Sequence, residues 1–348
     1  MGRRVLITGL DTFWGGRMAQ ALESDPEFEM VLGMASRNPT VALERTDFVH
    51  ADQTYSIVSR IVRATRPDTI VHTFMVTDST RATGRALHET NVIGTMNLLA
   101  AAGQAGSPVR QVVVKSSTLI YGSSATDPAW FSEDAVRTSA PTTRVEKSLM
   151  DVEELVRNFA EDNPSTVVSL LRFANVLGTD IVTAISTNLS KRLCPSIAGF
   201  DPLVQFVEED DVVRALEHVT RRRVPGIYNV AGAGKLPWSE VAALCGTRLL
   251  PLPPYGTRLA ARPLVQMKLL ELPPELEILL RFGRGVDTSR IAATGFEHRY
   301  TTAGAVESFI RALRLRRTVG QARPSYTYEH EVEQFFRRSP SVVSHADN

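Results

Sequence analysis

Residues 3–16 read RRVLITGLDTFWGG, and this stretch decides the fold. A short aliphatic run at residues 5–8 ends at a glycine-rich turn, and a helical pattern follows over residues 17–23. A strand, such a turn and a helix in this order present backbone N–H groups at a helix N-terminus, where they hold a pyrophosphate. We therefore predict a dinucleotide-binding turn. Its candidate cofactor-binding residues are Gly9, Thr12, Phe13, Trp14 and Gly15.

Thr12 stands where the spacing GxxGxxG would place its middle glycine. A β-branched side chain at this point requires a shift of the turn or of the pyrophosphate, so we expect dinucleotide binding to be weakened.

The first two hundred residues alternate Val/Ile/Leu-rich runs with helical patterns. This alternation is typical of a parallel sheet buried on both faces by helices, and it predicts a doubly wound α/β domain of the Rossmann type. The predicted strands are residues 5–8, 29–35, 48–51, 68–75, 111–116 and 167–173. The predicted helices are residues 17–23, 56–65, 87–102 and 144–159.

Beyond residue 178 the pattern loosens, and short runs at residues 206–207 and 226–230 look like strands that return to the main sheet. The domain assignment is therefore discontinuous. We expect a dinucleotide-binding domain over residues 1–177 plus about 204–231, a smaller substrate domain over about 178–203 plus 232–319, and a partly disordered tail over 320–348.

Composition excludes several classes of protein. The net charge of +1 favours neither a nucleic-acid partner nor an anionic surface. Two cysteines, Cys194 and Cys245, stand far apart, which argues against a disulfide framework and a structural metal site. No apolar run is long enough for a transmembrane helix, so we expect a cytoplasmic protein that binds no metal.

The residues after the second predicted strand bear on cofactor choice. Many NAD-binding proteins place an acid here to hold the ribose 2′-hydroxyl, whereas this chain reads Ala35-Ser36-Arg37. Hydroxyl and guanidinium groups suit a 2′-phosphate, so Ser36 and Arg37 favour NADP over NAD. Asp52 follows the third strand and is expected at the adenine end.

A series of short motifs follows in a fixed order. Besides the turn, Asp52 and Lys147, it comprises residues 91–95 (NVIGT), 116–122 (SSTLIYG), 171–178 (LRFANVLG), 206–215 (FVEEDDVVRA), 226–230 (GIYNV) and 287–290 (DTSR). Over residues 3–310 the chain thus resembles the extended short-chain dehydrogenase/reductases, within them the NAD-dependent epimerase/dehydratase family and its UDP-glucose 4-epimerases.

The resemblance implies hydride transfer by a Ser–Tyr–Lys set of residues. It assigns the serine to Ser117 and the lysine to Lys147, and it places Lys147 and Asn91 at the nicotinamide end and Asn175 at the substrate. The motif YxxxK then needs a tyrosine at position 143, where this chain has Thr143. An aliphatic hydroxyl is too weak an acid for this role, and Tyr121 is the remaining candidate for the proton donor.

Three functions stay open at this point. The first is an NAD(P)-dependent epimerase or dehydratase whose partner is a nucleotide sugar, with a homodimer as a possible assembly. The second is a reductase of a hydrophobic, steroid-like alcohol, because residues 249–282 are rich in Leu and Pro. The third is a non-catalytic dinucleotide sensor or scaffold, favoured by the missing tyrosine.

Overall fold

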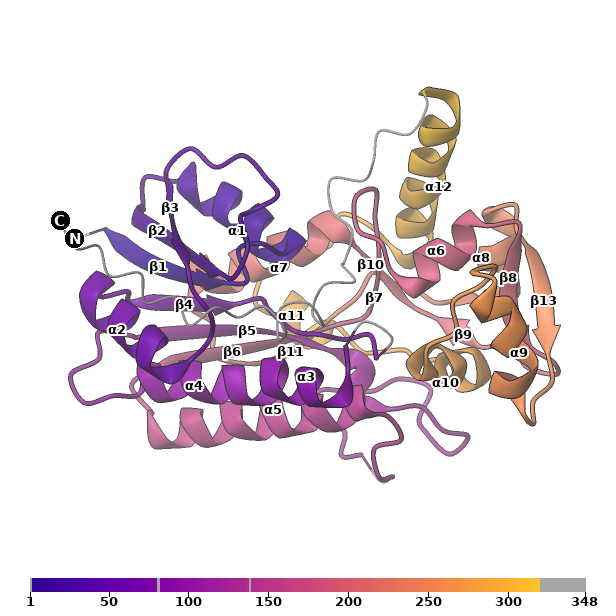
Figure 1. Ribbon diagram of the computed structural model, residues 1–348, viewed down its shortest axis with the longest axis horizontal. Coiled ribbons are helices and arrows are strands. Elements are labelled where there is room, and N and C mark those ends of the chain that lie inside the picture. The colour runs from indigo at the N-terminus through magenta and orange to yellow at the C-terminus, as the bar shows by residue number, and fades with distance from the viewer. Residues whose placement is uncertain (1, 80–81, 138, 320–348) are drawn as a thin grey trace.

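The computed structural model describes residues 2–79, 82–137 and 139–319, and Figure 1 shows them as one large sheet with helices on both sides and a smaller part beside it. The sheet has seven parallel strands in the order β11-β6-β5-β4-β1-β2-β3. These strands are β1 (Arg3–Thr8), β2 (Phe28–Ala35), β3 (Thr46–His50), β4 (Thr69–His72), β5 (Gln111–Ser117), β6 (Val167–Phe173) and β11 (Gly226–Val230).

The strand order reverses between β1 and β4. Val5 of β1 lies opposite Val31 of β2 on one side and Thr69 of β4 on the other. The loops that leave these strands therefore diverge, and they open a crevice at the carboxyl edge of the sheet, which is where such folds bind their ligands. The sheet and its order confirm the predicted Rossmann-type fold.

Each face of the sheet has its own apolar core, because successive side chains of a strand point to opposite faces. Val5 and Ile7 belong to one core and Leu6, between them, belongs to the other. Helices α1, α7 and α11 cover the first face, and α2, α4 and α5 cover the second (Figure 1). Their bounds are α1 (Phe13–Glu23), α2 (Tyr55–Thr65), α4 (Gly94–Ala102), α5 (Arg144–Asp162), α7 (Glu209–Arg222) and α11 (Ser289–Ala292).

The predicted helix over residues 87–102 is divided. It comprises α3 (Gly84–His88), one π-helical turn (Glu89–Ile93) and α4. A 3₁₀ turn (Thr118–Tyr121) follows β5. π-Helical turns inside helices are often found at functional sites, and this one lies beside the first of the two cavities described below.

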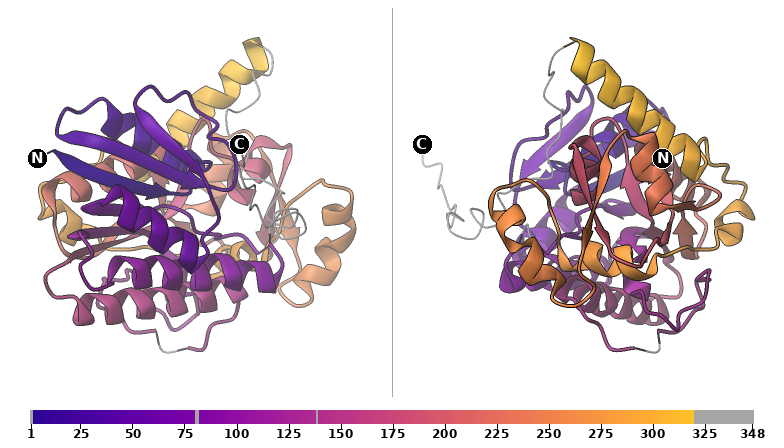
Figure 2. Two further views of the ribbon diagram at one scale, coloured as in Figure 1. Left: turned by 60° about the vertical axis from the view of Figure 1, so that its left-hand side comes forward. Right: turned by 90° about the vertical axis from the view of Figure 1, so that its right-hand side faces the viewer.

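A third apolar core lies beside the sheet and includes Phe206, Trp238 and Phe309. This part faces the viewer in the right-hand view of Figure 2. Its elements are β7 (Asn175–Leu177), α6 (Ala184–Ser190), β8 (Leu193–Ile197), β9 (Leu203–Val204), β10 (Phe206–Glu208), β12 (Leu236–Pro237), α8 (Trp238–Leu244), β13 (Arg248–Leu252), α9 (Thr257–Gln266), α10 (Pro274–Phe282) and α12 (Thr302–Val319).

Two segments pack differently from the prediction. Residues 206–207 were expected in the main sheet, but β10 pairs with β7 in a separate two-stranded sheet, and β11 alone returns to pair with β6. Ile291 and Phe296 fall in the predicted substrate domain, yet they pack into the core beneath α1 and α7. The exact domain bounds stay a prediction, and the predicted tail over 320–348 lies outside the described residues.

The described residues hold neither a candidate membrane span nor a candidate metal centre. None of their helices is long and apolar enough to cross a bilayer. No three or more His, Cys, Asp or Glu side chains there are grouped so as to hold a metal ion.

Candidate functional site

The turn after β1 requires glycine at two points. Gly9 has φ +74°, and a Cβ on it would lie 2.8 Å from Cβ of Phe74. A Cβ on Gly15 would lie 2.1 Å from the carbonyl oxygen of Gly9. Since no side chain fits at either point, the two glycines let the turn close tightly over the first turn of α1, whose N–H groups face the crevice.

Thr12 is the N-cap of α1, which explains how the turn accommodates it. Its hydroxyl donates to the carbonyl of Gly9 at 2.6 Å and accepts from the N–H of Gly15 at 3.1 Å. One of the N–H groups that a phosphate could use is therefore already bonded, so weakened dinucleotide binding stays our prediction. Phe13 is buried in the core, whereas Trp14 reaches the second of the two cavities below.

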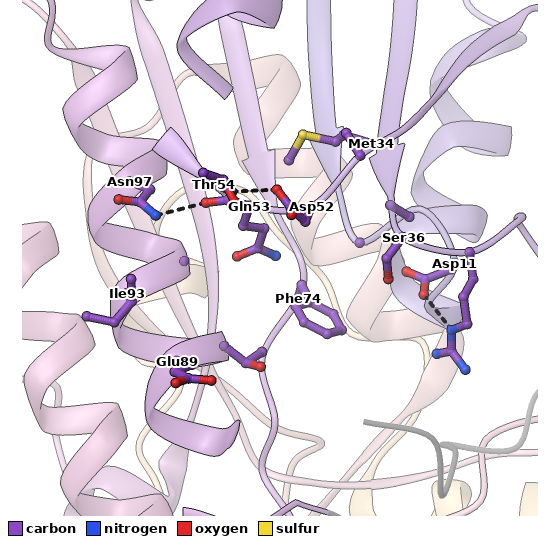
Figure 3. Close-up of a pocket in the computed structure, with 16 residues that line it drawn as sticks. Asp11, Met34, Ser36, Asp52, Gln53, Thr54, Phe74, Glu89, Ile93 and Asn97 are labelled. Atoms are coloured by element: carbon purple, nitrogen blue, oxygen red, sulfur yellow. Dashed lines mark hydrogen bonds and ion pairs between the residues drawn. The ribbon is translucent and has the colours of Figure 1, made fainter. Parts of the chain in front are cut away.

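A cavity of about 220 Å³ opens beside this turn, at the carboxyl ends of β1, β2 and β3 (Figure 3). It gathers four of the predicted cofactor residues, Gly9, Ser36, Arg37 and Asp52. We call it the first cavity. Its lining is Gly9, Asp11, Met34, Ala35, Ser36, Arg37, Ala51, Asp52, Gln53, Thr54, Phe74, Glu89, Thr90, Ile93, Gly94 and Asn97.

The polar groups of the first cavity are mostly held in place. Arg37 Nε donates to Asp11 Oδ2 at 3.2 Å, and Asp52 Oδ1 accepts from the N–H of Thr54 at 2.9 Å. Gln53 Oε1 is different, because it is buried and makes no hydrogen bond in the described structure. A buried oxygen packed against Gly94 is not itself open to a ligand.

The residues that line the first cavity from its helical side were not predicted from the sequence. Glu89, Thr90 and Ile93 reach it from the π-helical turn, and Asn97 from α4. The one available signal was the NVIGT motif, which pointed to Asn91 instead. Asn91 is fully buried and lines neither cavity. Its amide nitrogen donates to Val76 O and Ser148 Oγ, and its oxygen accepts from Val76 N. The predicted cofactor contact of Asn91 is thus corrected to a structural role.

A second cavity of about 140 Å³ lies at the ends of β5 and β6, across the strand-order reversal from the first. Its other wall comes from α6 and α10 of the smaller part. It brings together the predicted residues Trp14, Ser117 and Asn175. The full lining is Trp14, Thr77, Asp78, Lys115, Ser116, Ser117, Leu119, Phe173, Ala174, Asn175, Val176, Ile181, Val182, Thr183, Ala184, Ile185, Pro273, Glu275, Leu276 and Leu279.

Ser117 and Asn175 keep polar atoms at this cavity. Ser117 Oγ accepts from the N–H of Leu119 at 3.2 Å and lies 3.5 Å from the carbonyl of Phe173. Asn175 Nδ2 donates to Gln205 O at 3.2 Å. Both residues are placed to bind a ligand hydroxyl, which remains a proposal.

Three ionisable residues of the second cavity, Asp78, Lys115 and Glu275, were not predicted. Lys115 is buried on β5, on the same face as Ser117, and burial lowers its pKa to about 8. Glu275 is buried at the start of α10, where its Oε2 accepts from Ser79 Oγ and its Oε1 makes no hydrogen bond in the described structure. Burial raises the pKa of Glu275. A lysine inside the apolar run VVVKSS was the signal that could have identified Lys115.

Helix α5 does not carry the catalytic pair that the resemblance implied. Lys147 is exposed and lines neither cavity, because it lies on the side of the helix opposite the buried Val145 and Leu149. This placement corrects the expectation that Lys147 holds the nicotinamide ribose. Thr143 precedes the helix as its N-cap, with Oγ1 accepting from the N–H of Glu146 at 3.1 Å.

Tyr121 also lines neither cavity. Its hydroxyl donates to Asn229 Oδ1 at 2.7 Å and accepts from Arg172 Nη1 at 2.7 Å, and its ring stacks on Phe131. Burial raises its pKa. A phenol bonded in this way inside the core braces β5 against β11, and the geometry gives no support to Tyr121 as the proton donor.

Comparison with known proteins adds two kinds of similarity. Residues 5–231 match the family model described as the NAD dependent epimerase/dehydratase family. Uncharacterised proteins of Mycobacterium tuberculosis and Mycobacterium bovis are 32% identical over 313 residues, covering 88% of this chain and 83% of theirs. A UDP-glucose 4-epimerase of Mycoplasma genitalium is 29% identical over 123 residues, 35% of each chain.

Solved structures share the fold at low identity. The dTDP-glucose 4,6-dehydratase DesIV of Streptomyces venezuelae, solved with NAD bound, superposes with a TM-score of 0.70 at 22% identity, covering 93% of this chain and 100% of its own. The UDP-glucose 4-epimerase of Thermotoga maritima, solved with UDP-glucose, gives 0.69 at 17% identity, with 89% and 98% covered.

Proposed function

Since this chain belongs to the NAD-dependent epimerase/dehydratase family, within the extended short-chain dehydrogenase/reductases, we propose that it binds an NAD-type dinucleotide together with a nucleotide sugar. The single observation that carries this proposal is the pair of cavities on the two sides of the strand-order reversal. The adenosine half of the dinucleotide enters the first cavity, and its nicotinamide half extends toward the second.

The residues present fit a dinucleotide. Gly9 and Gly15 keep side chains out of the space above the N-terminus of α1, where a pyrophosphate binds. A Cβ on Gly94 would lie 1.9 Å from Gln53 Oε1, so glycine at this point lets Gln53 and α4 close the wall of the first cavity together. When bound, the dinucleotide supplies a hydride acceptor or donor. The chain itself orients the sugar through Ser117 and Asn175.

We further propose that NADP is preferred over NAD. Ser36 and Arg37 follow β2 and line the first cavity, and no carboxylate follows β2 directly. The guanidinium of Arg37 is steadied by Asp11. Steadying the cation in this way prepares it for a 2′-phosphate at little entropic cost.

The nucleotide sugar is the favoured partner because Asn175 and Ser117 offer hydrogen bonds at the second cavity, and because two solved relatives are named as nucleotide-sugar enzymes. Calorimetric titration of UDP-glucose into the protein, with NADP present, tests this. Asn175→Ala is expected to weaken binding about tenfold, the cost of one lost polar contact. Asn158→Ala, on the exposed face of α5, is the matched control. No binding of UDP-glucose or UDP-galactose to the wild type would remove the nucleotide sugar from the proposal.

A hydrophobic alcohol is the competing ligand class. Leu276 and Leu279, from the predicted Leu/Pro-rich segment, do reach the second cavity, where they meet Val182 and Ile185. Titration of a steroid alcohol under the same conditions decides between a nucleotide sugar and a hydrophobic alcohol as the ligand. Tighter binding of the steroid than of UDP-glucose would favour a reductase of hydrophobic substrates.

The second candidate function is non-catalytic dinucleotide binding. It is favoured by a specific observation: in the part of the chain that the structure describes, no tyrosine lines the second cavity. A phenol is the usual proton donor in this family, and general acid–base help is worth about 10²–10⁴-fold. We therefore expect little or no UDP-galactose 4-epimerase activity. Robust turnover of UDP-galactose to UDP-glucose by the wild type would exclude this candidate.

A further inference from the structure

Lys115 is a buried cation that the proposed function leaves without a role. Its ammonium lies 5.2 Å from the ring centre of Trp14 and 5.7 Å from that of Phe173. Among the described residues it has neither a hydrogen bond nor an ion pair, although it is only 6% exposed. An ammonium group held in this way costs free energy, so its retention in the second cavity calls for an explanation.

The position of Lys115 relates it to the nicotinamide half of a dinucleotide, and this step rests on the proposed function. A dinucleotide in this fold crosses the strand-order reversal above the N-terminus of α1. With adenosine in the first cavity, the nicotinamide half reaches the side of β5 and β6, which follow β4 beyond the strand-order reversal. Trp14, in the first turn of α1, and Lys115 both line the second cavity on that side.

The charge of the nicotinamide ring changes with its redox state. The oxidised ring carries one positive charge, and the reduced ring is neutral. Two positive charges less than about 10 Å apart repel by the equivalent of tenfold or more in affinity at an effective dielectric constant of about 20. Burial is the cause of the lowered pKa of Lys115, and no carboxylate within the described ranges pairs with the ammonium to cancel its charge.

We propose that Lys115 makes this site distinguish the redox states of its dinucleotide, so that the reduced, neutral form binds more tightly than the oxidised, cationic form. The consequence is a protein whose occupied fraction follows the ratio of reduced to oxidised cofactor. A ligand in the second cavity then lies more often beside a reduced nicotinamide, which can donate a hydride, than beside an oxidised one.

The test is a calorimetric titration of the wild type, Lys115→Met and Lys147→Met with NADH, NAD⁺ and ADP-ribose, with the NADPH and NADP⁺ pair measured in parallel. The wild type is expected to bind the reduced form at least tenfold more tightly. Lys115→Met keeps the side-chain length without its charge and should lose most of this ratio by gaining affinity for the oxidised form. Lys147→Met removes an exposed lysine and should match the wild type.

ADP-ribose lacks the nicotinamide, and it separates two explanations. Its affinity should be the same for the wild type and Lys115→Met. A clear loss of ADP-ribose affinity in Lys115→Met would show that Lys115 binds the diphosphate, and it would overturn the proposal.

A pH series on the wild type needs no variant. The amine of Lys115 is charged below its pKa of about 8 and neutral above it, so the preference for the reduced form should be full at pH 6.5 and fall by pH 9.5. The ionisable groups that line the same cavity are Asp78 from the loop after β4 and Glu275 from α10, and His72 of β4 points to the opposite face of the sheet, toward Thr95 of α4. Trp14 and Phe173, from α1 and β6, do not titrate. His72, with a pKa of about 4, stays neutral across the series.

The remaining outcomes are decisive too. If Lys115→Met does not fold, Lys115→Arg takes its place. This variant keeps the cation and should keep the tighter binding of the reduced dinucleotide. Equal binding of the two redox forms by Lys115→Arg would count against the proposal. Equal affinities for both redox forms, unchanged with pH, overturn the role of Lys115 and leave the proposed cofactor binding intact. Binding of neither form overturns both.

Discussion

At the residue scale, Arg37 and Asp11 show how a cofactor preference is built from a side-chain pair. Asp11 comes from the turn after β1 and Arg37 from the end of β2, and the two meet at the first cavity. Asp11 is only 5% exposed, so its carboxylate needs the guanidinium as a partner. The pair is neutral overall, and it fixes the position of the Arg37 guanidinium beside Ser36, where a ribose 2′-substituent is proposed to lie.

Replacing Arg37 by alanine tests this arrangement. Arg37→Ala should weaken NADPH binding tenfold or more, because a charge-assisted hydrogen bond contributes about 1.5–3 kcal/mol. NADH has no 2′-phosphate, so its affinity should change by less than about threefold. Calorimetry on both cofactors measures the difference, and Arg60→Ala, exposed on α2, is the control. Equal losses for NADPH and NADH would assign Arg37 to the folding of the turn instead.

At the element scale, α5 explains why the catalytic pair of the family was misplaced. Its buried face, which includes Val145, Leu149 and Val152, packs into the core beneath β5, and Lys147 points away from it. Two residues four apart on the sheet-facing side are Val145 and Leu149, neither of which can move a proton or carry a charge. The helix thus serves as a packing element, and Thr143 serves to start it.

Thr143→Ala should lower the free energy of unfolding by about 1 kcal/mol, the usual cost of a lost N-cap. The hydroxyl satisfies the N–H of Glu146, which is buried with it. Chemical denaturation measures the change, and Thr40→Ala, exposed in the loop after β2, is the control.

Thr143→Tyr should cost at least as much stability as Thr143→Ala and should create no epimerase activity, because position 143 lines neither cavity. A gain of UDP-galactose turnover in Thr143→Tyr would contradict this placement and restore the original alignment of the motif.

At the scale of the whole molecule, His72 joins three elements near the centre of the sheet. It lies on β4, its Nδ1 is 2.6 Å from Thr8 Oγ1 of β1, and its Nε2 is 3.0 Å from Thr95 Oγ1 of α4. Burial lowers its pKa to about 4. Because the folded protein holds this ring neutral, acid favours the unfolded chain, where the ring can take up a proton.

The stability of the whole fold should therefore depend on pH through His72. Its contribution is fully present above about pH 6.5, the ordinary pKa of histidine, and is lost as the pH falls toward 4, by up to about 3 kcal/mol. Urea denaturation at pH 7, 5.5 and 4.5 measures this loss. His72→Gln should have a lower free energy of unfolding than the wild type at pH 7, and this free energy should fall less steeply with pH over the same range. The control His50→Gln, at an exposed position on β3, should show the same pH dependence as the wild type. An unchanged slope in His72→Gln would assign the acid sensitivity to other groups.

The sequence by itself determined the strands of the sheet and the strand-end side of the first cavity, but not the helical wall of that cavity. Aliphatic runs such as VVV before Lys115 predict strands buried on both faces, since both faces of a parallel sheet are covered. Four cofactor-binding candidates could be assigned because each closely follows the end of a strand. They are Gly9 after β1, Ser36 and Arg37 after β2, and Asp52 after β3. The carboxyl ends of parallel strands meet at one edge, so local position along the chain was enough to bring them together.

Only the tertiary structure decided the second cavity. Lys115 and Glu275 are remote in the sequence, and they face one space because α10 packs across the ends of β5 and β6. The direction of the Lys147 side chain likewise depends on which side of α5 meets the sheet. Side chains two residues apart on a helix point to nearly opposite sides, so a shift of two residues in the alignment of a motif places its lysine on the wrong side. Spacing along a chain predicts which residues share a strand or a helix. The packing of apolar faces decides where each element points, and so which side chains share a site.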